Sequence, residues 1–142
     1  MTVRAATSGP SLAHTDANGE PAAPRTLEIP NEMVRVYKEA LGRGPTKASV
    51  HFARPDTLVV LLEDTMTQAE RTLAALGEVE RLRQSRQVLA SALEDRFRSI
   101  VERAIGRRTL AFISGFDTRR DVAVEVFTFE PESSNGHGAT AR

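Results

Sequence analysis

The sequence predicts an α+β fold in which two hairpins form a four-stranded antiparallel sheet, each preceded by a helix, in αββ-αββ order. Two segments repeat apolar residues at helical spacing, and each is followed by segments in which apolar and polar residues alternate. Glycine, proline and a helix-capping motif mark the borders. The two halves share this order without obvious sequence identity, so they do not indicate an internal repeat.

The first helix is short and expected to follow Pro30, with Asn31 as its N-cap. Apolar side chains then fall three and four residues apart, at Met33, Val34, Tyr37, Ala40 and Leu41. Gly42 can adopt the left-handed conformation of a helix C-cap, and Pro45 cannot continue a helix. The helix is therefore predicted to end at or near Leu41.

From Thr46 the pattern changes to a period of two, which predicts a strand covered on one face. Its apolar side is formed by Ala48, Val50 and Phe52, and its polar side by Lys47, Ser49 and His51. After a turn at residues 54–56, the apolar run Thr57–Glu63 predicts a strand covered on both faces. These two strands are expected to pair as the first hairpin.

A long helical pattern begins at Thr67, which forms a capping box with Glu70. One straight helix over residues 67–105 would be about 58 Å long, whereas a compact domain of this size is about 35 Å across. We therefore expect a bend near Gly77 or residues 83–87, or a projecting part covered by another subunit. We favour a bend combined with homo-oligomerisation.

The second hairpin is predicted at residues 109–116 and 121–129, after the helix stop at Gly106. In its second strand three valines alternate with Ala123, Glu125 and Phe127. This completes the predicted four-stranded sheet.

Composition indicates one domain in this chain of 142 residues. The domain is expected at residues 29–130, between disordered segments at 1–28 and 131–142 that offer little apolar surface. The 19 acidic residues balance 19 basic ones, which argues against a general polyanion binder. The absence of cysteine excludes disulfides and thiolate chemistry and fits the cytoplasm. The longest apolar run, residues 58–62, is far shorter than the roughly 20 residues that cross a bilayer.

The sequence GRGPTK at residues 42–47 has the glycines and lysine of a phosphate loop. However, a phosphate loop needs a strand, then GxxxxGK[ST], then a helix, and here a helix precedes and a strand follows. We therefore interpret the stretch as a helix-stop turn. Arg43 and Lys47 are its best exposed candidates for a charged partner.

The acids Glu63 and Asp64 could hold a cation or act as acid and base, but no third ligand is evident. We favour a solvated strand end beside the next helix. His51, on the polar side of its strand, is expected at the surface. A mixed-charge helical face, solvated or alternatively partner-binding, is expected from Glu78, Glu80, Arg81, Arg83 and Arg86.

Further arginines cluster at the end of the long helix, where positive charge suits the helix dipole. Arg107 and Arg108 belong to this cluster and could form a basic edge with Arg119 and Arg120. The candidates for binding a partner or anion are thus Arg43, Lys47, Arg107 and Arg108. We expect no catalytic residues, no metal and no cofactor, and the few aromatic residues make nucleic-acid stacking an unfavoured role.

Three longer stretches carry a family resemblance: NEMVRVYKEALGRGPTKASV, LVVLLEDTMTQAERTLAALGE and AIGRRTLAFISGFDTRRDVAVEVFTFE. Together, over roughly residues 29–130, they resemble the MpsC-like family, long catalogued as a domain of unknown function. The resemblance implies a small soluble protein, named for a sodium-translocating, membrane-potential-generating system whose other components are membrane proteins. It transfers no catalytic residues to this chain.

We interpret the chain as a non-enzymatic cytoplasmic accessory or regulatory module, peripheral to the membrane where it meets integral transporter subunits. The alternative is a nucleic-acid- or anion-binding regulator that uses Arg43, Lys47 and the arginines near Arg107, although the neutral net charge weakens it. An enzyme whose substrate supplies the missing chemistry ranks third.

Overall fold

The computed structural model describes residues 4–8, 14–15, 21–22 and 25–131. The helical elements are η1 (Arg25–Leu27), α1 (Glu28–Leu41), α2 (Gln68–Ala75) and α3 (Val79–Ile105). The main strands are β4 (Lys47–Arg54), β5 (Thr57–Glu63), β6 (Thr109–Asp117) and β7 (Val122–Phe129). Three short strands precede them, β1 (Arg4–Ser8), β2 (His14–Thr15) and β3 (Pro21–Ala22).

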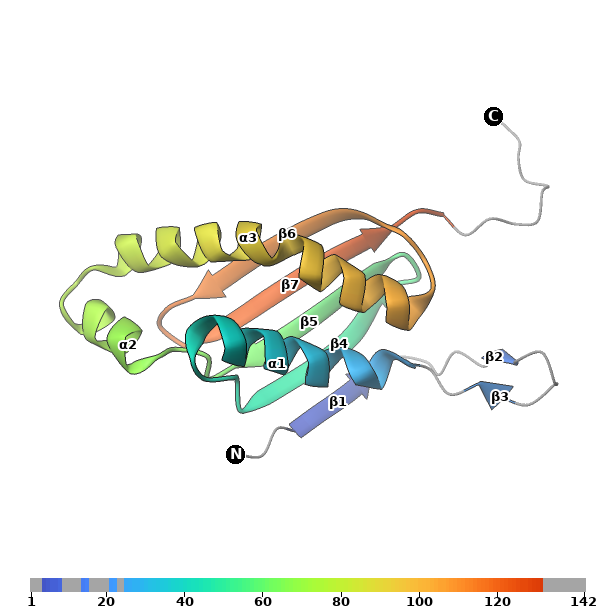
Figure 1. Cartoon of the computed structure of the whole chain (residues 1–142), viewed down its shortest axis with the longest axis horizontal. Coiled ribbons are helices and arrows are strands. Elements are labelled where there is room, and N and C mark those ends of the chain that lie inside the picture. The colour runs from blue at the N-terminus through green and yellow to red at the C-terminus, as the bar shows by residue number, and fades with distance from the viewer. Residues whose placement is uncertain (1–3, 9–13, 16–20, 23–24, 132–142) are drawn as a thin grey trace.

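The sheet confirms the predicted α+β fold. The strands β4, β5, β7 and β6 lie side by side in that order, and every neighbouring pair is antiparallel. The sequence did not predict β1, which pairs in parallel with β4 at the edge of this sheet. Figure 1 shows α1 and α3 lying across the same face of the sheet.

The core lies between that face and the two helices. Alternate strand residues point into it, including Val50, Leu58, Val60, Leu62 and Phe127. They meet apolar residues of α1 and α3, including Ile29, Met33, Phe97 and Val101. Buried and half-buried residues alternate along β5, so the prediction that β5 is covered on both faces is wrong. The described helices cover only one face of the sheet.

The boundaries of α1 differ from the prediction at one end only. Its N-cap is Leu27 rather than Asn31, because Pro30 fits within the first turn, where a backbone N–H has no partner inside the helix. At the other end Gly42 adopts the left-handed conformation with φ 86°, and its N–H donates to the Lys38 carbonyl at 2.9 Å. The predicted helix stop is confirmed.

The long helical segment is broken in two. Gly77, with φ 84°, lies between α2 and α3, which confirms the predicted bend at this glycine. The polar residues 83–87, the other predicted bend site, lie inside α3. The capping box at the start of α2 is also confirmed, since Thr67 and Glu70 exchange both of its hydrogen bonds.

The predicted disordered segments fall largely outside the described residues, at 1–3, 9–13, 16–20, 23–24 and 132–142. The described part of residues 1–28 contains β1, β2, β3, η1 and the first residue of α1. None of the described helices combines the length and the hydropathy of a membrane-spanning segment.

Candidate functional site

Two aspartates with left-handed backbones meet at one end of the sheet. Asp64, with φ 61°, follows β5, and Asp121, with φ 56°, precedes β7. Aspartate tolerates this conformation better than most residues. The N–H of Asp64 donates to the Asp121 carbonyl at 3.0 Å, so the two strand ends are tied directly to each other.

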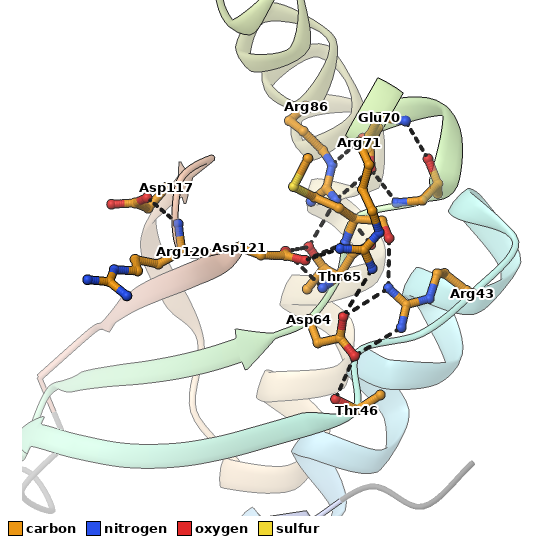
Figure 2. Close-up of polar contacts among 12 residues, drawn as sticks. Arg43, Thr46, Asp64, Thr65, Glu70, Arg71, Arg86, Asp117, Arg120 and Asp121 are labelled. Carbon is orange, nitrogen blue, oxygen red and sulfur yellow. Dashed lines mark hydrogen bonds and ion pairs between the residues drawn. The ribbon is translucent and has the colours of Figure 1, made fainter. Parts of the chain in front are cut away.

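The carboxylate of Asp121 holds the loop between β5 and α2 (Figure 2). One oxygen accepts hydrogen bonds from the backbone N–H and the hydroxyl of Thr65, both at 2.9 Å. The other accepts from the N–H of Met66 at 3.0 Å. Because Thr65 and Met66 are buried, these bonds satisfy backbone groups that water cannot reach.

The carboxylate of Asp64 binds side chains from two other segments, the turn between α1 and β4 and the helix α2 (Figure 2). It accepts hydrogen bonds from Arg43 at 3.2 Å, from Thr46 at 2.9 Å and from Arg71 at 3.3 Å. Arg43 also donates to the Met66 carbonyl at 2.7 Å. The Arg43 hydrogen bond is the main reason why the pKa of Asp64 lies below its ordinary value.

Arg86 is buried, which corrects the prediction that it belongs to a solvated mixed-charge face. Its guanidinium donates to both carboxylate oxygens of Glu70, at 2.6 and 2.9 Å, and to the Thr65 hydroxyl at 2.9 Å. It also lies 4.1 Å from the ring centroid of Phe116. The break at Gly77 folds α2 back along α3 and brings Glu70 to this arginine.

Glu70 therefore forms part of the capping box of α2 and is also the acid of the buried ion pair with Arg86. Burial raises its pKa, but the hydrogen bonds from Arg86 and from the Thr67 backbone outweigh burial, and the pKa lies below its ordinary value. A sequence signal for the burial of Arg86 existed, because Leu82 and Ala90, four residues to either side, share its helix face and are buried. The other arginines of the predicted face, Arg81 and Arg83, are exposed as expected.

Glu125 is the second buried acid, and it lies on the helix-facing side of β7. The Tyr37 hydroxyl donates to its Oε2 at 2.6 Å, whereas Oε1 has no hydrogen-bond partner in the described part of the chain. Burial raises the pKa of Glu125 to about 7, although Tyr37, Ser114 and Arg86 act in the opposite direction. Burial and this carboxyl also raise the pKa of Tyr37 well above its ordinary value.

A cavity of about 20 Å³ adjoins Glu125 and Arg86. Tyr37, Phe97, Phe116 and Ser114 complete its polar and aromatic lining. This volume holds about one water molecule and no organic substrate. The arrangement can therefore hold a proton or a water molecule beside a buried carboxyl. Glu125 was not among the candidates from the sequence, although its place between Ala123 and Phe127 on the buried side of a strand was a signal.

The four arginine and lysine candidates from the sequence do not converge. Arg43 is engaged by Asp64, and Lys47 lies 3.9 Å from Glu63 at the same end of the sheet. At the opposite end, Arg107 donates to the carbonyls of Pro55 and Glu130, both at 2.8 Å, and Arg108 lies 3.9 Å from Glu130. The predicted basic edge does not form either, because Arg119 and Arg120 follow β6 whereas Arg107 and Arg108 precede it.

The acids that were considered as cation ligands, and His51, have other partners in the structure. Glu63 and Asp64 each pair with basic side chains, and His51 Nε2 lies 2.9 Å from the Ser49 hydroxyl. Within residues 25–131 and the shorter described stretches, no three acidic, histidine or cysteine side chains gather as a metal site would require.

A larger groove of about 330 Å³ lies between α1 and α3, on the helix side of the molecule. Its charged and polar lining is formed by Glu32, Arg35, Asp95, Arg96, Ser99 and Arg103. Two of these arginines are paired, Arg96 with Glu39 at 2.7 Å and Arg103 with Glu32 at 2.8 Å. Arg35 and Asp95 form no ion pair with any described residue. The groove thus presents one unpaired charge of each sign.

Comparison with known proteins gives one match. The family model described as Na+-translocating membrane potential-generating system (MpsC) matches residues 25–131, which include α1 to α3 and β4 to β7. No curated protein and no solved structure matches the chain significantly.

Proposed function

The chain belongs to the MpsC family, and from this premise we propose that it is a non-enzymatic accessory or regulatory module of a Na+-translocating membrane potential-generating system. In this proposal it works on the cytoplasmic side, at the periphery of the membrane, and acts through contacts with integral membrane components. One observation carries the proposal: several charged residues of the matched region, residues 25–131, bind one another. Arg43 and Arg71 hold Asp64, and Arg86 holds Glu70.

These pairs support a binding role because they use charged groups to build the fold instead of directing them at a substrate. Two of these arginines also hold the loop between β5 and α2, because Arg43 donates to the Met66 carbonyl and Arg86 to the Thr65 hydroxyl. A further charged feature is the groove between α1 and α3, where Arg35 and Asp95 form no ion pair with any described residue. We propose this groove as the surface that contacts a charged, cytoplasm-facing segment of a membrane component.

A co-purification experiment tests the role. The full chain is co-expressed with the membrane components of its system, the membranes are solubilised, and the components are purified through a tag on the membrane protein. The wild-type chain is expected to co-purify, and Arg35→Glu is expected to reduce recovery at least tenfold. Arg83→Glu makes the same charge change at an exposed site of α3 outside the groove and should leave recovery unchanged.

The outcomes of this experiment test the accessory role and the groove as its contact surface separately. If the wild-type chain does not co-purify and its removal leaves the potential across membrane vesicles unchanged, the accessory role is wrong. If Arg35→Glu and Arg83→Glu are both recovered like the wild type, the accessory role stands and the groove is not its contact surface.

The alternative, a nucleic-acid- or anion-binding regulator, draws less support from these contacts. Arg43 already binds a carboxylate and a carbonyl, and Arg107 binds two carbonyls at the other end of the sheet. A ligand would have to displace those partners. Salt-dependent binding of a nucleic acid that is lost in Lys47→Ala would favour this alternative.

A further inference from the structure

The face of the sheet opposite α1 and α3 is covered by none of the described helices (Figure 1). Cross-strand neighbours form rows on it that are apolar over β5, β7 and β6: Val59, Val126 and Ile113 in one row, and Leu61, Val124 and Gly115 in the next. On β4 the polar residues His51 and Ser49 continue these two rows. Ile113 is 61% exposed. We call this surface, formed by Val59, Leu61, Ala111, Ile113, Val124 and Val126, the open sheet face.

The open sheet face is uncharged across its centre. The charged residues of these strands other than the buried Glu125 lie at the two ends: Lys47 pairs with Glu63 and β6 ends at Asp117 at one end, and β4 ends at Arg54 at the other. A surface of this kind can pack against a second copy of itself without placing like charges together. The open sheet face has no charged side chains at its centre with which to bind the charged segment proposed for the groove between α1 and α3.

The outward side of the four main strands, which includes the open sheet face and the polar residues around it, has a size that suits a weak dimer. Four strands about 4.8 Å apart, each with four outward residues about 6.8 Å apart, span a flat area of roughly 19 by 27 Å. Two copies would then cover roughly 1,000 Å² of flat surface, which is close to the lower limit of about 1,000 Å² for a specific interface. We expect a dissociation constant in the micromolar range for such an area.

The rest of this chain is poorly suited to cover the face. The residues outside the described ranges contain three large apolar side chains, those of Met1, Val3 and Leu12. Residues 132–142 contain only alanines as apolar residues. A second copy, by contrast, offers an apolar β-branched surface of the same shape.

We propose that the open sheet face is the interface of a homodimer, in which the sheets of two copies pack face to face across a two-fold axis. Sheets packed in this way lie about 10 Å apart with their strands about 30° from parallel. The dimer would leave the groove between α1 and α3 of each copy accessible on the outside. This inference does not depend on the accessory role, because it concerns the opposite side of the molecule.

Sedimentation equilibrium of the full chain, at concentrations from about 1 to several hundred micromolar to bracket that dissociation constant, tests the proposal. The wild type is expected to dimerise, and Ile113→Glu is expected to raise the dissociation constant at least tenfold. Val88→Glu is a matched control, because Val88 is a similarly exposed aliphatic residue, 70% exposed, on α3. Thermal melts of the diluted proteins check that both variants fold.

A wild-type chain that remains monomeric throughout the range would overturn the proposal. So would a dimer that Val88→Glu weakens and Ile113→Glu does not, because the long helix would then carry the association.

Chemical labelling gives a second measurement that does not rely on a disruptive charge. The chain contains no cysteine, so Ile113→Cys and Val88→Cys each introduce a single thiol. As protein concentration rises, maleimide labelling of I113C is expected to slow while that of V88C is unchanged. If I113C is protected only when the membrane components are present, and the chain alone is monomeric, a different protein covers the face and the homodimer is wrong.

Discussion

Tyr37 and Glu125, 88 residues apart in the sequence, share a hydrogen bond of 2.6 Å inside the core. The bond joins α1 to β7, and the unpartnered oxygen of the same carboxyl adjoins the small cavity shared with Arg86. A carboxylate at 1% exposure loses nearly all of its hydration. The neutral acid is therefore favoured in the folded protein, and its oxygen can still accept the hydrogen bond from the tyrosine hydroxyl.

Stability is predicted to fall as pH rises between about 4.5 and 7 because of Glu125. Burial raises the pKa of Glu125 from 4.5 to about 7, so the folded state holds this proton more tightly than the unfolded state. The resulting stabilisation is fully present below pH 4.5 and is lost as pH rises through 7. A shift of this size corresponds to about 3 kcal/mol. Urea unfolding at pH 5, 6, 7 and 8 measures the slope.

Glu125→Gln is the matched variant, because it keeps the shape and the acceptor for Tyr37 but cannot ionise. Its stability should vary less with pH than that of the wild type, and the variant should be the more stable protein at pH 8. All other ionisable groups are the same in both proteins, so the difference between the two slopes isolates Glu125. Equal slopes would show that Glu125 does not titrate in this window.

Removal of Arg86 is predicted to be costly because Glu70 would remain buried without its partner. We expect Arg86→Met to lower the free energy of unfolding by about 3–5 kcal/mol. Glu70→Gln preserves the capping box. The double variant R86M/E70Q should lose about 1–3 kcal/mol less free energy of unfolding than the sum of the losses of the two single variants. Arg83→Met, at an exposed site on the same helix, should change stability by no more than about 0.5 kcal/mol. Strict additivity of R86M and E70Q would contradict the coupling.

Asp121 is predicted to be more tolerant of asparagine than of alanine. Alanine removes all three hydrogen bonds to Thr65 and Met66 and is strained at φ 56°, which we expect to lower the free energy of unfolding by about 2–4 kcal/mol. Asparagine accepts the left-handed backbone and keeps one acceptor oxygen, so it should cost about half as much. Chemical denaturation gives both values, and equal costs for the two variants would contradict this account.

The sequence allowed the elements of the fold to be predicted where each depends on local chemistry. Gly42 as a helix cap, the capping box of Thr67 and Glu70, and the two hairpins all follow from neighbouring residues. The parallel strand β1 could not be predicted in the same way, because its pairing with β4 joins segments that are distant in the chain. The start of α1 was misplaced because Asn31 is a good cap in sequence, although tertiary packing of Ile29 extends the helix.

The candidate site was harder to predict because its charges meet across distant segments. The sequence indicated that Arg43 and Arg86 were exposed, since no local rule pairs an arginine with an acid 16 or 21 residues away. Glu125 is a similar case, because its partner Tyr37 lies on the first helix. Arg86 and Glu125 each stand at a position where the pattern of their helix or strand places buried apolar residues. Arg43 follows the helix stop at Gly42. In all three cases only the tertiary structure identified the partner.

Gly44 is predicted to be required for packing, which gives the GRGPTK stretch a structural explanation. A Cβ at this position would lie 2.9 Å from the Cγ1 atom and 3.0 Å from the carbonyl oxygen of Val34. We expect Gly44→Ala to cost about 1–3 kcal/mol, and Val34→Ala in the same chain to restore part of that loss by removing one of the two contacts. At Gly42 a Cβ meets nothing within 4 Å, but φ is 86°, so Gly42→Ala should cost about 1–2 kcal/mol that Val34→Ala does not restore. Chemical denaturation of the two glycine variants, each with and without Val34→Ala, distinguishes steric from backbone strain, and equal rescue at both glycines would contradict the assignment.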